Sequence, residues 1–177
     1  MVREMAWRGI GGLVGMALFL FGMGAGDCRA DDSAVSRATL AGLQGVRVIV
    51  EEPQPNIQRY AEKYGLTRAQ VQADVERRLQ QAGIRTVQGD EWLKTPGRPL
   101  LYVNINTHET EKYWYAYDIR LELRQLVLLE ANPKIRTMAN TWSVNITGVA
   151  NIGNLNVIKH DVGVFVDRFI AAYKGGK

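Results

Sequence analysis

Residues 115–124 read YAYDIRLELR, and this stretch decides the fold more than any other part of the chain. Its odd-numbered positions are Tyr115, Tyr117, Ile119, Leu121 and Leu123, and its even-numbered positions are Ala116, Asp118, Arg120, Glu122 and Arg124. This alternation of apolar and mostly polar side chains predicts a long β-strand with one buried face. A strand that needs cover on one side only is typical of an antiparallel sheet whose other face meets water.

Further strands are predicted on both sides of this stretch, at residues 46–50, 84–87, 100–107 and 138–147. In the last of these, Met138, Trp142, Val144 and Ile146 share the apolar parity. Residues 126–129 read LVLL and are apolar on both sides, so this end is expected to be covered on both faces or bulged.

Two helices are predicted. Residues 67–82 have an apolar stripe, begin at Thr67 with Gln70 completing a capping box, and end before Gly83. Residues 158–173 carry a broader apolar stripe. The expected fold is therefore α+β: an antiparallel or mixed sheet of about five strands with two main helices packed on one face, in the order βαββββα.

The N-terminal thirty residues have the composition of a bacterial export signal. Arg3 and Arg8 precede an uncharged, largely apolar stretch at 9–26, and small residues follow at 28 and 30. We expect cleavage after Ala30, a flexible tether at 31–45 and a single domain at 46–177. The expected location is the bacterial periplasm or outer envelope, and the alternative is an N-terminally membrane-anchored protein.

Cys28 is the only cysteine of the chain, so no intramolecular disulfide is expected. Its place after an apolar segment makes it a candidate lipidation site, although Asp27 stands where a lipoprotein signal has a small residue. The alternative is that Cys28 is removed with the signal. Membrane contact is expected only through the signal segment or such a lipid anchor.

The charge balance and the motifs restrict the function classes. Lys and Arg number 22 and Asp and Glu number 18, a bias too small and too evenly spread to indicate a nucleic-acid partner. The two histidines, His108 and His160, lack the three or four convergent ligands of a metal site. We therefore expect no catalytic residue, no cofactor and no metal, and a protein that is not an enzyme.

The candidate binding surface combines two aromatic residues with the charged positions of the central strand: Tyr102, Trp114, Asp118, Arg120, Glu122 and Arg124. The aromatic rings would stack on sugars or apolar partners, and the charges would meet a charged partner. The alternative is a solvent-facing surface that neutralises itself, in which each exposed pair contributes about 0–1 kcal/mol.

Several segments together carry a resemblance: residues 45–51, 65–67, 81–84, 99–103, 115–125, 141–142 and 166–170. Their pattern resembles a family of uncharacterised exported bacterial proteins, over nearly all of the chain after residue 30. In architecture the chain is similar to the N-terminal domain of the TolB family and to outer-membrane assembly lipoproteins of the LptE kind. The resemblance implies an envelope domain and brings no activity with it.

The leading hypothesis is a non-enzymatic periplasmic or envelope-associated interaction or assembly module whose partner is an unidentified envelope protein or component. An exposed apolar patch or an open strand edge would favour it. The alternative is a small-molecule or glycan binder that uses an aromatic platform. A third hypothesis is a hydrolase that uses Glu51, Glu52 or His108.

Overall fold

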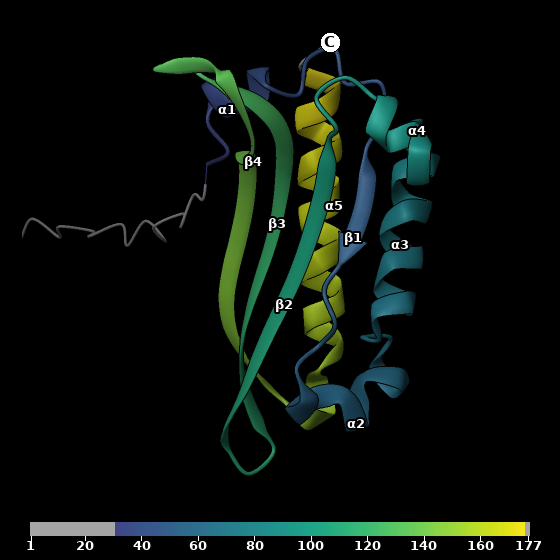
Figure 1. The fold of residues 1–177 in the computed structure, drawn as a ribbon. Helices are drawn as coiled ribbons and strands as arrows, with labels where there is room; N and C mark the ends of the chain where they lie inside the picture. Colours follow the sequence, from purple (N-terminus) through teal and green to yellow (C-terminus); the bar gives the residue numbers. More distant parts are fainter. Residues whose placement is uncertain (1–30, 176–177) are drawn as a thin grey trace, which may run out of the picture.

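The computed structural model describes residues 31–175 and has an α+β fold built on a four-stranded mixed sheet (Figure 1). The predicted signal segment and Cys28 lie outside the described residues. The strands, in sheet order, are β1 (Arg47–Val50), β2 (Leu100–Glu111), β3 (Trp114–Leu129) and β4 (Asn132–Asn151). β1 pairs parallel with β2, and the other two pairs are antiparallel.

The helices are α1 (Ala34–Ala38), α2 (Pro55–Tyr64), α3 (Arg68–Gln81), α4 (Gly89–Lys94) and α5 (Asn156–Gly175), with a short 3-10 turn, η1 (Ile152–Asn154), before the last. The two long helices, α3 and α5, contact each other, and they pack on β1 and on β3 and β4, respectively. The α+β class and the two main helices are as predicted.

The expectation of about five strands is wrong by one strand. Residues 84–87 make only an isolated parallel bridge, Val46 with Thr86, because the chain turns into α4 directly afterwards. The predicted order βαββββα is replaced by β1, α2, α3, α4, β2, β3, β4, α5 after the short α1.

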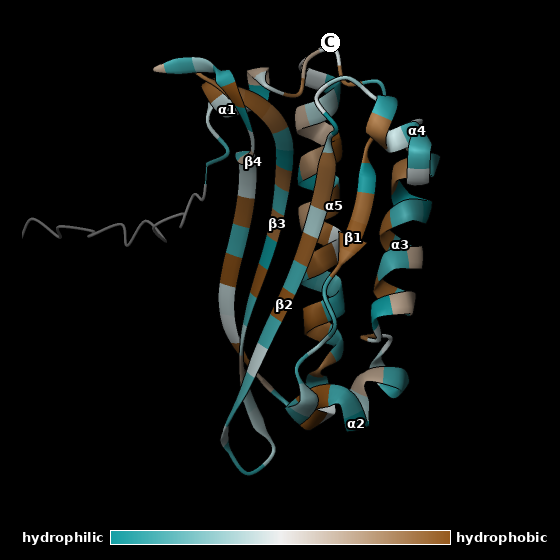
Figure 2. Ribbon diagram, viewed as in Figure 1, coloured by the Kyte–Doolittle hydropathy of each residue, from teal (hydrophilic) through white to brown (hydrophobic). Residues whose placement is uncertain are grey.

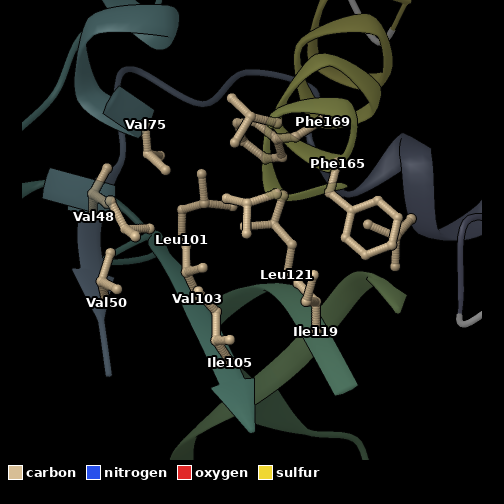
Figure 3. Packing of buried hydrophobic residues seen from close by; sticks show 14 of the residues in the cluster. Val48, Val50, Val75, Leu101, Val103, Ile105, Ile119, Leu121, Phe165 and Phe169 are labelled. Carbon is tan, nitrogen blue, oxygen red and sulfur yellow. The ribbon is translucent and has the colours of Figure 1, made fainter. Parts of the chain in front are cut away.

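The hydrophobic core lies between the sheet and the two long helices (Figure 3). Valines of β1 and α3 meet aliphatic side chains of β2 and β3, and Phe165 and Phe169 close this layer from α5. Tyr117, Ile119, Leu121 and Leu123 are all buried, as the alternation predicts. Figure 2 shows the same alternation as hydrophobic and hydrophilic bands along the strands.

The α3 helix follows its sequence signals closely. The Thr67 hydroxyl accepts from the Gln70 backbone N–H, and the Gln70 side chain returns to the Thr67 backbone, which completes the predicted capping box. Gly83 has φ 77°, the left-handed conformation that glycine adopts without a Cβ clash. Val71, Val75 and Leu79 form the buried face of the helix.

The segment at 31–45 is not the flexible tether that its polar composition predicts. Ser33 caps α1, Leu40 is buried in the core, and the Tyr173 hydroxyl donates to the Leu43 carbonyl. Asp32 accepts a 2.7 Å hydrogen bond from the Trp142 indole nitrogen. These contacts attach the segment to β4 and to α5.

A bulge in β4 changes the face of its first half. Leu123 pairs with Trp142 but Arg124 pairs with Asn140, so Thr141 is the extra residue. The prediction that Met138 shares the face of Trp142 is therefore wrong: Trp142 is buried, and Met138 lies across from Leu126 and is exposed.

The far end of β4 also differs from expectation. The strand predicted from the sequence ends at residue 147, yet β4 continues to Asn151. Gly148 pairs with Tyr117, whose ring lies where a Cβ would be: a Cβ at residue 148 would come within 2.5 Å of that ring. Packing against Tyr117 thus requires a glycine at position 148 of this strand.

Among the helices in residues 31–175, we find none with the length and apolar character needed to cross a membrane.

Candidate functional site

The outer face of the sheet carries most of the predicted binding residues. Asp118, Arg120, Glu122 and Arg124 all point to the face opposite the buried side chains of β3, and Tyr102 joins them from β2, where it pairs with Glu122. α3 and α5 lie on the opposite face, as Figure 1 shows. The structure therefore brings these five residues together on one surface.

The charges of this face are paired with one another. Arg120 Nε lies 2.9 Å from Asp118 Oδ1, and Arg124 Nη2 lies 2.7 Å from Glu122 Oε2. Arg124 also stacks over the Tyr102 ring, with its Cζ 3.9 Å from the ring centroid. Burial, and to a smaller extent the hydrogen bond to the Glu51 carboxylate, raises the pKa of Tyr102, so this hydroxyl stays neutral. The charges of this surface thus neutralise one another, as in the alternative of a self-neutralising, solvent-facing surface.

The structure does not assemble an aromatic platform. Trp114 is on the same outer face and is 46% exposed, but it stands eight residues along β3 from Glu122, the partner of Tyr102. At about 3.3 Å per residue this separates the two rings by roughly 26 Å. Trp142 belongs to the core, edge-on to Phe169 at 5.4 Å.

The carboxylates at the end of β1 have structural partners. The Glu51 side chain accepts from the Asn104 amide, which also bonds to Asn106. Glu109, near the end of β2, pairs with Arg59 of α2 at 3.5 Å. Within residues 31–175 no group of three or more His, Cys, Asp or Glu side chains converges in a way that would hold a metal ion.

A groove of about 250 Å³ lies between α3 and α5. Val71, Val75 and Val162 contribute to its apolar lining, and His160 stands at its rim. Two ion pairs cross it: Lys159 with Asp74 at 2.7 Å, and Arg78 with Asp167 at 3.2 Å. The hydrogen bond from Lys159, and to a smaller extent that from Arg77, lowers the pKa of Asp74. The Lys159–Asp74 pair therefore stays charged. These two ion pairs thus join α3 to α5 across the groove.

Several exposed apolar side chains gather at the far end of the β3–β4 hairpin, which we call the arm (residues 126–138). Leu128 is 58% exposed, and Leu129, Ile135 and Met138 are also exposed. By strand alternation, Leu126, Leu128 and Met138 share the outer face, whereas Val127 and Leu129 share the other face. Ile135 lies in the irregular stretch of β4 between the partners of Leu128 and Leu129. In Figure 1 the arm lies at the upper left, to the side of α5.

Near its base, the arm is attached to the rest of the molecule by hydrogen bonds. The Leu126 backbone N–H donates to the Gly97 carbonyl at 2.7 Å, and Gln125 donates to the Thr39 carbonyl at 3.0 Å. Of the two alternatives expected for residues 126–129, cover on both faces is wrong for this chain by itself, because Leu128 and Leu129 are exposed. The other alternative, a bulge, is confirmed, because the pairing with β4 shifts register between Leu128 and Leu129. Two adjoining apolar faces without cover indicate a contact surface. The LVLL run at 126–129 indicates this contact surface in the sequence, but the run alone does not show whether its side chains are exposed.

Comparisons of this chain with protein-family models, with curated proteins and with solved structures found no match.

Proposed function

We propose that this protein is a non-enzymatic interaction module of the bacterial envelope that docks on a partner protein through the arm. The observation that supports this function best is the exposure of apolar side chains on both faces of residues 126–138. An exposed apolar surface of this kind marks an interaction site in a soluble domain.

A protein groove suits the arm better than a lipid bilayer. The two edges of a hairpin carry unpaired N–H and C=O groups, which cost several kcal/mol each in hydrocarbon. The arm also carries the charged residues Glu130, Lys134 and Arg136. A partner protein can cover both apolar faces and pair a strand edge at the same time.

The small-molecule alternative has less support. Tyr102 is stacked under Arg124, and Trp114 stands about 26 Å away along the sheet. Neither ring has a second ring beside it on that face to form a stacking pair.

The test is photo-crosslinking in the native envelope, with a photoreactive side chain placed at Leu128. We expect one discrete adduct between this chain and another protein. The matched position is Gln80, which is exposed on α3 and should give no such adduct. The double variant Leu128→Ser with Ile135→Ser should lose binding of that partner while its unfolding curve stays unchanged.

Three outcomes would contradict the proposal. These are adducts with lipid alone, equal adducts from Leu128 and from Gln80, and an adduct whose mass is twice that of this chain. The last would assign the arm to self-association.

A further inference from the structure

The outer edge of β4 offers backbone groups to an incoming strand. The Ser143 N–H donates to the Asp31 carbonyl at 3.3 Å, so Ser143 points its backbone away from β3. Because alternate residues of an antiparallel strand point the same way, Asn145, Thr147 and Val149 also direct their N–H and C=O groups outward. In the part of the chain that the structure describes, β4 is the last strand of the sheet at this edge.

This edge lacks the features that usually prevent edge-to-edge pairing. Residues 137–157 contain no Asp, Glu, Lys or Arg. Natural edge strands are commonly protected by charges, by proline or by a covering element. In β4 the residues of this kind, Pro133, Lys134 and Arg136, all lie in the arm.

The edge also exposes apolar side chains on both sides of the sheet. Ile146 is 38% exposed on the helix side, beyond the cover that α5 gives. Val149 is 63% exposed on the outer side. A strand added at this edge would bury both side chains and satisfy the backbone groups beside them.

We propose that β4 pairs with β4 of a second copy of this chain, antiparallel and about a two-fold axis at Thr147. In a two-fold pair every segment meets itself, so a charged edge would repel its own copy, whereas this uncharged edge does not. Thr147 is the middle of the three outward-pointing residues, so Asn145 lies opposite Val149 of the second copy. The two sheets then join into one continuous sheet.

The neighbouring contacts determine the register. Asp31 occupies the edge at Ser143, and η1 turns the chain away after Asn151. Residues 145–149 form the open stretch between these two limits. The pairing leaves the two arms at opposite ends of the joined sheet, so it is independent of what the arm binds.

Disulfide trapping tests this register directly. In the full chain, Cys28→Ser removes the only cysteine, and Thr147→Cys then introduces one at the axis. Directly opposed residues of a hydrogen-bonded antiparallel pair have Cα atoms about 5.5 Å apart, within the range of a disulfide. We expect mild oxidation to give a covalent dimer with Thr147→Cys and none with Gln80→Cys on α3. Mixing Asn145→Cys with Val149→Cys copies should give a covalent heterodimer.

Charge substitution gives a second, independent measurement. Thr147 is exposed, and its hydroxyl donates to Asp118 on the opposite strand. Thr147→Lys can pair with that carboxylate and should leave the unfolding curve of the monomer nearly unchanged, whereas Thr147→Glu should lower its stability slightly. Each variant alone should raise the dimer dissociation constant by about tenfold or more, because like charges meet at the axis. A mixture of the two variants should form the heterodimer, as measured by sedimentation velocity.

Two results would overturn the proposal. One is a monomer at every concentration up to about a hundred micromolar, the range in which even weak specific pairs with dissociation constants of that order associate. The other is a dimer that persists equally in both charged variants, which would place the contact on another surface such as the arm.

Discussion

The two halves of the β3–β4 hairpin have similar sequences but opposite surroundings. In the half that lies under α5, Ile119, Leu121 and Trp142 are buried. In the arm, Leu128 and Ile135 are exposed. Both halves are rich in aliphatic side chains, and in both the two strands pair antiparallel. Alternation therefore determines the face of a side chain, while the covering layer determines whether that face is buried.

The reach of α5 explains the difference. β4 and α5 each have 20 residues. A helix rises about 1.5 Å per residue and a strand about 3.3 Å, so α5 is about 30 Å long and the path of β4 is about 66 Å long. One helix cannot cover the whole of such a strand. The remainder must be polar, covered by another element or used for contact, and the arm exposes apolar side chains that nothing in residues 31–175 covers.

The largest effect should come from removing one side chain in the covered half. We expect Leu121→Ala to lower the free energy of unfolding by about 2–5 kcal/mol, because it leaves a cavity in the core. The matched change in the arm, Leu128→Ala, should alter it by about 0.5 kcal/mol or less. Urea denaturation of the two variants measures both values. Equal losses would show that the arm is packed in solution.

A smaller effect is expected from adding a methyl group at the margin of the covered half. Gly148→Ala places a Cβ within 2.5 Å of the Tyr117 ring, and overpacking of this kind costs about 1–3 kcal/mol. Gly153→Ala is the control, since its nearest neighbour is Asn151 Oδ1 at 3.5 Å, an ordinary contact. Thermal unfolding of the two variants should differ clearly. A Gly148→Ala protein as stable as the parent would mean that the Tyr117 ring moves freely.

The smallest effect concerns the boundary between the two halves, where Asp32 holds Trp142. The bond from Arg37, together with that from the indole, keeps the pKa of Asp32 below its usual value despite partial burial. A carboxyl whose pKa is lowered by folding stabilises the protein above its unfolded pKa of about 3.9 and loses that effect as the pH falls through the folded pKa. Asp32→Asn should therefore cost about 1 kcal/mol at neutral pH.

The same substitution should cost progressively less as the pH falls below about 5 and through the lowered pKa of the folded Asp32 carboxyl, below which the parent side chain is neutral as well. Urea unfolding of both proteins, followed by Trp fluorescence at each pH, gives this difference. If the difference in unfolding free energy between the two proteins stayed constant over this pH range, the Asp32 contact would stabilise the protein through packing and not through the charge of the carboxylate. Asp74, whose pKa is also lowered, is present in both proteins and cancels in the comparison.

Local patterns in the sequence predict much of the fold. Alternation identified the buried face of β3, and the Thr67–Gln70 pair located the start of α3. Contacts between distant segments were not predictable in the same way. Residues 31–45 look like a tether because what holds them, Trp142 and α5, is about a hundred residues away in the chain. The Ser33 cap was a local signal that a helix begins there.

In the candidate binding surface, too, some features were predictable from the sequence and others were not. The shared outer face of Asp118, Arg120, Glu122 and Arg124 follows from parity, and the structure places them together. The internal pairing of these charges depends on rotamers and on the neighbouring strand, which a sequence does not display. The bulge at Thr141 has no signature in the alternation, so the exposure of Met138 was not predictable.

The parallel pairing of β1 with β2 has a consequence for the order in which this chain folds. Arg47 pairs with Leu100, whereas β2, β3 and β4 are joined by short hairpins. Closing a loop of about fifty residues costs more chain entropy than closing a hairpin, and contacts between distant residues slow folding. A chain that emerges N-terminus first therefore presents β1 well before its partner strand exists. We expect the three-stranded meander and α5 to form the nucleus, and β1, with α2 and α3 behind it, to dock last.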